Sequence, residues 1–124
     1  MSTKDLNRFQ NLSFEEFKKL ALDESLSRNE KIGFPDSYRS GKESVILNDI
    51  LSKIPVIGSG KNKTIIDIGC GCGPLLDLII ESSNKNQHEL VLIDSNEMLS
   101  QIPDVDQVRD RYLLSSIDLC SRLR

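Results

Sequence analysis

The chain has 124 residues and a mass of 14.0 kDa, which fits one small domain or part of a larger one. Its 16 Lys and Arg residues against 19 Asp and Glu residues give a formal charge of -3. This acidic balance, without a dense basic stretch, argues against nucleic acid as a partner. No apolar run is long enough to cross a membrane, and the N-terminus lacks the apolar core of a signal peptide. Three cysteines, an odd number, suit a reducing compartment, so we expect a soluble, cytoplasmic protein.

The first predicted element is a short amphipathic helix. Residues 1–12 are polar, and we expect a flexible N-terminus there. Ser13 and Glu16 have the spacing of a capping box, in which each side chain bonds the backbone N–H of the other residue. The apolar residues that follow have helical spacing, and they predict a helix from Phe14 to Leu22.

A loop and a second helix are predicted next. Residues 23–38 are rich in Ser, Asn and charge, with Gly and Pro as breakers, and predict a loop with one helical turn at most. An i, i+4 stripe of Ile and Leu then predicts a helix from Gly41 to Lys53, which Pro55 ends. Residues 58–63 are polar and predict a flexible linker.

Two predicted strands flank a third helix. Thr64–Ile68 is a short β-branched run, as expected of a parallel strand that is covered on both faces. Pro74 suits the first turn of a helix, and apolar residues continue that helix to a polar loop at 82–87. Glu89–Ile93 predicts a second buried strand, with Asp94 at its carboxyl end. Strand, glycine turn, helix and strand together predict a right-handed βαβ unit.

The C-terminal segment is predicted to be helical. Asn96–Gln101 starts one helix, which Pro103 stops, and residues 104–124 predict one amphipathic helix. Because two strands do not make a stable parallel sheet, residues 13–124 are expected to form an incomplete α/β domain, the first part of a doubly wound fold.

A glycine-rich turn carries the chemistry. The segment Asp67-Ile-Gly-Cys-Gly-Cys-Gly-Pro74 follows the first strand, and its glycines allow a sharp turn and the close approach of a ligand. The helix that begins at Pro74 directs free N–H groups and its positive dipole end at this turn. Asp94 lies at the same edge of the sheet, where a carboxylate can accept both hydroxyls of a ribose. The sequence therefore predicts a site for a ligand that contains a nucleoside.

The kind of nucleoside ligand follows from the spacing. The third glycine of the dinucleotide pattern Gly-x-Gly-x-x-Gly would fall at Pro74, which counts against an NAD-dependent dehydrogenase. An acidic residue followed by Gly-x-Gly-x-Gly instead closely resembles motif I of class I S-adenosylmethionine-dependent methyltransferases. Val91–Leu99, with an acidic strand end and Ser-x-x-Met-Leu, resembles their second motif. The resemblance covers residues 41–102 and implies a Rossmann-like fold. The chain is expected to be a truncated form that contains only the N-terminal part of this fold.

The resemblance implies methyl transfer from S-adenosylmethionine to a small-molecule acceptor, such as a sugar or another metabolite. It also implies a cofactor-binding set consisting of Asp67, Gly69, Cys70, Gly71, Gly73, Asp94 and Ser95. The backbone of residues 69–71 would wrap the methionine part. Asp67 would order the turn and face the amino group, Asp94 would hold the ribose hydroxyls, and Ser95 would lie near the adenine. Later motifs of the family have no counterpart, so the catalytic residues are not assigned.

Other residues have plainer interpretations. Cys70 and Cys72 lack zinc-ligand spacing, and His88 lies far off in a predicted polar loop, so we expect packed thiols and no metal site. Tyr38 and Arg39 lie where such enzymes often contact a cofactor or substrate, although their composition favours a surface loop over a ligand contact.

A second function is open at the level of sequence. The short predicted sheet would leave apolar surface and a strand edge uncovered. The chain would then be a non-catalytic remnant or interaction module, which completes its sheet with a partner chain or forms a homo-oligomer.

Overall fold

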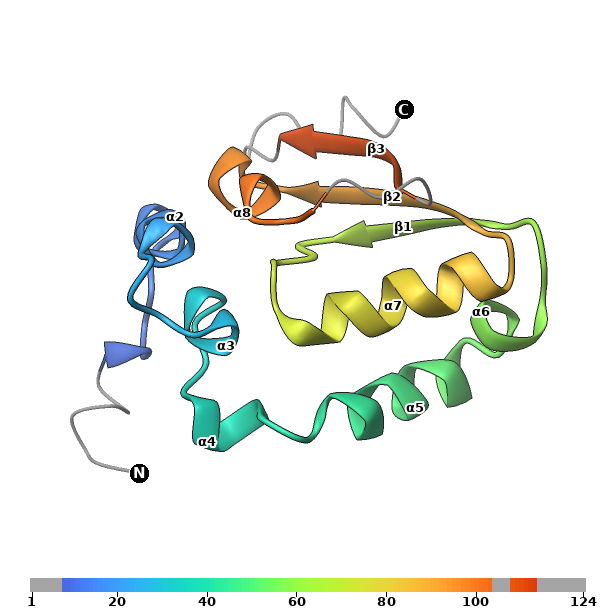
Figure 1. The fold of residues 1–124 in the computed structure, drawn as a ribbon, viewed down its shortest axis with the longest axis horizontal. Coiled ribbons are helices and arrows are strands. Elements are labelled where there is room, and N and C mark those ends of the chain that lie inside the picture. The colour runs from blue at the N-terminus through green and yellow to red at the C-terminus, as the bar shows by residue number, and fades with distance from the viewer. Residues whose placement is uncertain (1–7, 104–107, 114–124) are drawn as a thin grey trace.

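The computed structural model describes residues 8–103 and 108–113. Figure 1 shows the elements in chain order, namely α2 (Phe14–Leu22), α3 (Arg28–Lys31), α4 (Asp36–Arg39), α5 (Glu43–Lys53), α6 (Val56–Ser59), β1 (Thr64–Ile68), α7 (Pro74–Lys85), β2 (Glu89–Asp94), α8 (Asn96–Ser100) and β3 (Val108–Leu113). The protein is thus a small mixed α/β protein. Within the described ranges, no helix has the length and apolar content that crossing a bilayer requires.

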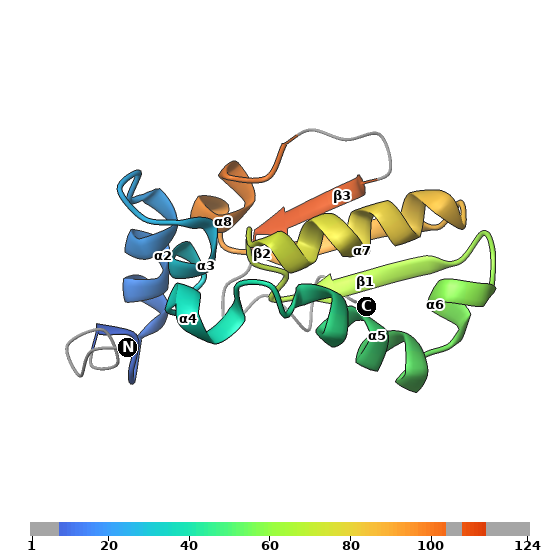
Figure 2. The same cartoon turned by 60° about the horizontal axis from the view of Figure 1, so that its bottom comes forward.

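The sheet has three parallel strands in the order β1-β2-β3. β2 is the central strand, and it pairs in register with β1 so that Ile68 lies beside Ile93. α7 follows one face of this sheet, and α5 and α6 lie on the β1 side (Figure 2). The βαβ unit predicted from the sequence is therefore present as β1, α7 and β2.

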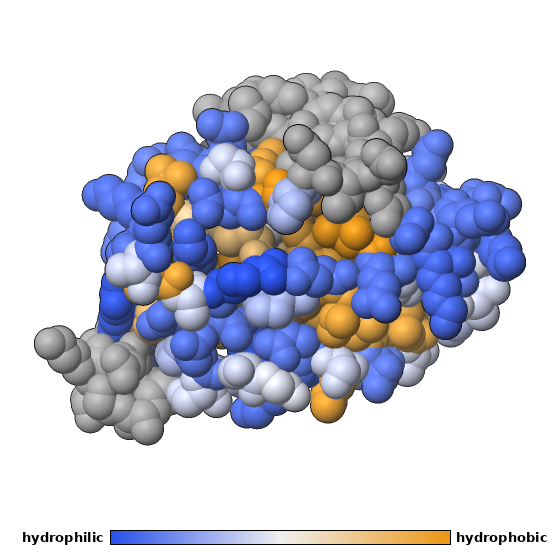
Figure 3. All heavy atoms as spheres, in the orientation of Figure 1, coloured by the Kyte–Doolittle hydropathy of each residue, from blue (hydrophilic) through white to orange (hydrophobic). Residues whose placement is uncertain are grey.

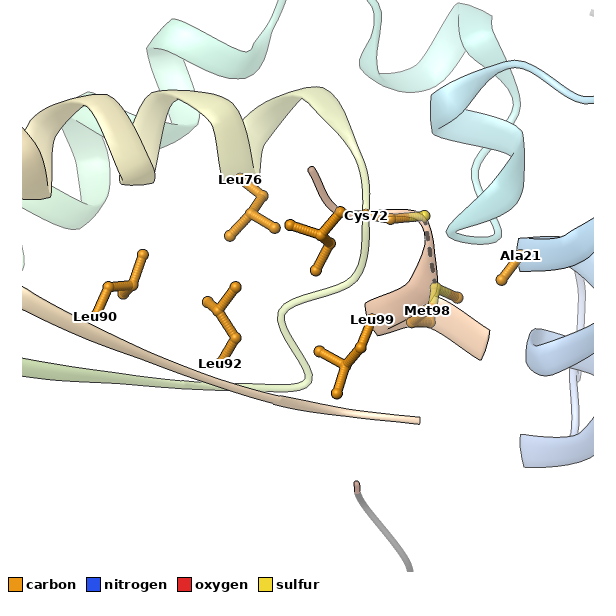
Figure 4. Packing of buried hydrophobic residues seen from close by; sticks show 8 residues of the cluster. Ala21, Cys72, Leu76, Leu90, Leu92, Met98 and Leu99 are labelled. Carbon is orange, nitrogen blue, oxygen red and sulfur yellow. Dashed lines mark hydrogen bonds between the residues drawn. The ribbon is translucent and has the colours of Figure 1, made fainter. Parts of the chain in front are cut away.

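The core lies between α7 and the sheet. Leu90 and Leu92 of β2 are fully buried, and they pack with Leu76 of α7 (Figure 4). Cys72 and Met98 extend this cluster toward Ala21 of α2, which is also fully buried. Burial of these apolar side chains is the main favourable contribution to folding, at about 25 cal/mol per Å² removed from water. The cluster holds the carboxyl ends of β1 and β2 in a fixed position.

Several local predictions are confirmed. α2 spans the predicted residues, and Ser13 and Glu16 form the predicted capping box. β1 has the predicted bounds, and Pro74 occupies the first turn of α7. In each case the signal is local in sequence, so the neighbouring residues are enough to specify the structure.

The predicted loop at 23–38 contains two short helices, α3 and α4, where at most one turn was expected. Ser27 and Glu30 form a second capping box at the start of α3, with the same spacing as the first. The signal was therefore present in the sequence, although α3 has only four residues.

Two further loop predictions are wrong in part. The linker at 58–63 begins inside α6, and the loop at 82–87 begins inside α7, which continues to Lys85. Asn86 ends α7, and its side-chain amide donates to the Ile57 carbonyl of α6 at 3.2 Å. Tertiary contacts thus extend a helix through a polar segment whose composition alone predicts a loop.

His88, predicted to lie in a polar loop, is buried. Its Nδ1 accepts a hydrogen bond from the backbone N–H of Lys63 at 3.0 Å, and its Nε2 lies 3.0 Å from the Ile57 carbonyl oxygen. The imidazole therefore joins the beginning of β1 to α6 and has a structural role.

The C-terminal prediction is wrong where the structure describes that segment. β3 is a strand within residues 104–124, for which one helix was expected, and the rest of that range lies outside the described residues. The sheet accordingly has one strand more than the two expected. β3 forms by pairing with β2, which is distant in sequence. The prediction used only the local spacing of apolar residues, and this spacing contains no information about such pairing.

The sequence predicted that β1 is covered on both faces, and the exposure of its side chains differs from this prediction. Ile66 and Ile68 are half-exposed, whereas Val91 and Ile93, their register partners in β2, are buried. Figure 3 shows apolar surface (orange) interrupting the mostly hydrophilic face of the molecule. β1 is an edge strand of the described sheet, and this position explains the exposure of its side chains.

Candidate functional site

The glycine turn joins β1 to α7 with a backbone that two of its glycines make possible. Gly69 and Gly71 have φ angles of 72° and 66°, in the left-handed region. A residue with a Cβ costs about 1–2 kcal/mol in this conformation. Gly73 is the N-cap of α7, with φ of -83°, a conformation that any residue adopts.

Asp94 holds this turn in place from the end of β2. Its Oδ2 accepts from the backbone N–H of Gly71 at 2.7 Å, and its Oδ1 accepts from the N–H of Ser95 at 2.7 Å. The hydroxyl of Ser95 in turn accepts from the N–H of Met98 at 3.2 Å and caps α8. The buried Asp94 carboxylate thus fixes the two motifs relative to each other.

Ile32, which ends α3, packs on the glycine turn. A Cβ built at Gly73 would lie 2.6 Å from Ile32 Cδ1, and one at Gly71 would lie 3.0 Å from Ile32 Cγ2. A Cβ at Gly69 would meet nothing within 4 Å. At Gly71 and Gly73 an added Cβ would thus meet a side chain of the protein itself, although both residues line the cavity described below. Gly69 is the open position.

Arg28 fastens α3 to the same turn. Its guanidinium donates to both carboxylate oxygens of Asp77 and, at 3.3 Å each, to the carbonyls of Cys72 and Gly73. The hydrogen bond from Arg28 lowers the pKa of Asp77, and the same bond raises the pKa of Arg28. Sequence reasoning missed this contact because nothing local indicates that residues so far apart in the chain meet.

A cavity of about 430 Å³ opens at the carboxyl ends of β1 and β2, and we call it the strand-end cavity. Its wall includes the whole predicted cofactor-binding set, Asp67, Gly69, Cys70, Gly71, Gly73, Asp94 and Ser95. The opposite wall comes from the N-terminal helices and the segments between them, and includes Phe14, Phe17, Ile32, Phe34 and Arg39. Of these, only Arg39 belongs to a segment for which the sequence suggested a ligand contact.

Asp67 differs electrostatically from Asp94. Its side chain is half-buried in the cavity wall, and no hydrogen bond to its carboxylate is found among the described residues. Burial, and then the negative charge of Asp94, raise the pKa of Asp67 to about 6. A cationic ligand group would favour the charged form of this carboxylate and lower its pKa again.

The two cysteines of the turn are thiols. Cys72 is buried and Cys70 is half-buried. The Sγ of Cys72 lies 3.7 Å from Met98 Sδ, a contact drawn as a dashed line in Figure 4. Burial raises the pKa of both thiols, and the charge of Asp67 raises that of Cys70 further. In the ranges that the structure describes, no group of three or more His, Cys, Asp or Glu side chains is placed to hold a metal ion. The packed role predicted for Cys72 is confirmed.

Comparisons of the chain with protein-family models, with curated proteins and with solved structures find no match. The class of protein is therefore defined by the geometry alone. It is an α/β protein with a parallel sheet and with a mainly apolar cavity, containing a few charged and polar side chains, where two of its strands end. Cavities at this edge are where open parallel sheets bind their ligands.

Proposed function

We propose that the chain binds S-adenosylmethionine in the strand-end cavity, as the cofactor-binding part of a Rossmann-like class I methyltransferase. One observation carries the proposal: seven residues chosen from two separate sequence motifs all line one cavity. The volume of about 430 Å³ lies in the range of small-molecule sites, roughly 300–1,000 Å³. The reaction would be methyl transfer to a small-molecule acceptor.

The cavity offers a partner for each polar part of the cofactor. Gly69 leaves open space beside the backbone for the methionine part, and Asp67 presents a carboxylate to the amino group. Each oxygen of Asp94 accepts one backbone N–H and keeps capacity for a further donor, so the same carboxylate can receive the ribose hydroxyls. Asp94 would then link the cofactor directly to the turn that surrounds it.

The chemistry in such a site is mainly positioning. The sulfonium of the cofactor supplies an activated methyl group, and the protein holds the acceptor in line with it. The rigid turn, fixed by Asp94 and Arg28, would keep the cofactor from moving relative to the sheet.

The proposal is tested by calorimetric titration of the chain with S-adenosylhomocysteine, the product form of the cofactor. We expect saturable binding, which Asp94→Ala weakens tenfold or more because a charge-assisted hydrogen bond is lost. A folded wild-type chain that binds no S-adenosylhomocysteine at millimolar concentration would contradict the proposal.

A pair of glycine variants separates ligand contact from backbone strain. Gly69 and Gly41 both have positive φ angles, 72° and 81°, and a Cβ at either one meets nothing within 4 Å. Gly69 lines the strand-end cavity and Gly41 does not. Gly69→Ala and Gly41→Ala are therefore expected to lose similar stability, about 1 kcal/mol, while only Gly69→Ala weakens binding. Equal affinities for the two variants would argue against contact at Gly69.

The exposed β1 strand favours a second candidate function, a non-catalytic module that completes its sheet with another chain. β1 has a strand neighbour on one side only in the described sheet, and its Ile66 and Ile68 side chains are half-exposed. Light scattering on the purified chain tests this candidate. A dimer that Ile66→Lys dissociates would support it, and a monomer over the micromolar range would count against it.

A further inference from the structure

The strand-end cavity has charges of both signs on different walls. Asp67 and Asp94 lie where β1 and β2 end, and Arg39 of α4 lies in the wall that the N-terminal segments form. Among the residues that line this cavity, Arg39 is the single Lys or Arg side chain. A ligand that fills the space would meet carboxylates along one side and a guanidinium along another.

The guanidinium of Arg39 is held in place without being neutralised. It lies 4.5 Å from the centroid of the Phe34 ring, a cation–π contact with another residue of the cavity wall. No described carboxylate forms an ion pair with it, in contrast to Arg28, which binds Asp77 through both oxygens. With respect to the described residues, the N–H donors of Arg39 therefore remain available for an anion.

We infer that Arg39 binds the carboxylate of the amino-acid part of the ligand, while Asp67 binds the amino group. The inference rests on the proposed function and identifies which residue binds the carboxylate of the cofactor. An α-amino acid is zwitterionic, so it needs an anion and a cation in the same cavity, and these two residues supply them. The planar guanidinium can bond a carboxylate through two N–H groups at once.

The test compares two ligands that differ only in the carboxylate. These are S-adenosylhomocysteine and its decarboxylated form, the 3-aminopropyl thioether of adenosine, titrated into the wild-type chain and into Arg39→Gln. We expect the wild type to prefer S-adenosylhomocysteine by tenfold or more, which is the effect of a lost charge-assisted contact. In Arg39→Gln this preference is expected to fall to about twofold or less, with the affinity for the decarboxylated ligand nearly unchanged.

Lys42→Gln is the matched control, because it removes one positive charge close to Arg39 in sequence from a side chain that does not line the cavity. It is expected to keep the full preference. Thermal unfolding reports whether each variant folds. Should Arg39→Gln not fold, Arg39→Lys keeps the charge without the planar fork and is expected to lose several-fold of the preference.

The outcomes separate the two proposals. If wild type binds both ligands and Arg39→Gln retains the preference, Arg39 does not bind the carboxylate, and the proposed function stands without it. If the wild type binds both ligands equally, the inference is likewise overturned. If the folded wild type binds neither ligand, the proposed function itself fails.

Discussion

The paired strands β1 and β2 are similar in sequence and different in surroundings. Both are short apolar runs with an aspartate near the carboxyl end, and they pair residue for residue. Ile93 of β2 is 1% exposed, whereas its partner Ile68 of β1 is 51% exposed. β2 has a strand on each side, and β1 has a strand on one side only in the described sheet. An apolar run therefore specifies a strand without specifying what covers it.

The largest expected effect concerns these two isoleucines. Ile93→Ala removes buried methyl groups and should lower the free energy of unfolding by about 2–5 kcal/mol. Ile68→Ala, at a half-exposed site, should lower it by about 1 kcal/mol or less. Urea unfolding of both variants at micromolar concentration measures the difference. Equal costs would mean that β1 is covered in solution and would favour the interaction module over a free edge.

The elements predicted correctly are those with signals inside a few residues. The Ser13 capping box, Pro74 at the start of α7 and the glycines of the turn each satisfy a local backbone requirement. β3 and the contacts of His88 depend on partners far along the chain, and no local pattern contains them. Sequence thus indicates which segments form strands and turns, while strand neighbours and burial come from the tertiary fold.

The same distinction applies to the candidate site. The sequence placed Asp67 and Asp94 at one edge of the sheet, and both line the strand-end cavity. It suggested a ligand contact for the segment of Arg39, but it did not indicate that Ile32 would cover two of the glycines or that Phe34 would form part of the opposite wall. These residues reach the cavity through the packing of α3 and α4, two short helices in a segment whose composition predicts mainly loop.

The aspartates of the two strands provide the next comparison, with effects of opposite sign. Asp94 accepts two backbone N–H groups, and Asp94→Asn should cost about 1–3 kcal/mol because one donor loses its acceptor. Asp67 has no such donors among the described residues, so Asp67→Asn should stabilise the unliganded chain at pH 7.5, by an amount of the order of 1–3 kcal/mol. Urea unfolding at pH 7.5 measures both variants.

The pH dependence of the Asp67 effect follows from its pKa. This pKa is raised from 3.8 to about 6 in the folded chain, mainly by burial. Between these values the folded state holds the proton longer than the unfolded state does, so the free energy of unfolding falls as the pH rises through this window. Asp67→Asn should remove that fall and match the wild type near pH 4. If the free energy of unfolding of Asp67→Asn had the same pH dependence as that of the wild type, Asp67 would be solvated in the folded state.

The smallest expected effect concerns the contact between Arg28 and Asp77. This contact lies at the turn after β1, the strand that has a neighbour on one side only in the described sheet. The two side chains are 48% and 52% exposed, so solvent screens the pair, and Asp77→Asn should cost less than about 1 kcal/mol at pH 7. Because Arg28 lowers the pKa of Asp77, this contribution is complete at neutral pH and declines as the pH falls through the lowered value.

Asp49→Asn, which breaks the exposed pair with Lys53 in α5, is the control for an ion pair with no contact to the turn. Arg28→Gln should cost more than Asp77→Asn, because it also removes the donor to the carbonyls of Cys72 and Gly73. If all three variants cost the same, the contacts of Arg28 with the carbonyls contribute nothing measurable. The carboxyl end of β1 would then be held by Asp94 of β2 and by the packing of Ile32, with no measurable contribution from the hydrogen bonds of Arg28 to the two carbonyls.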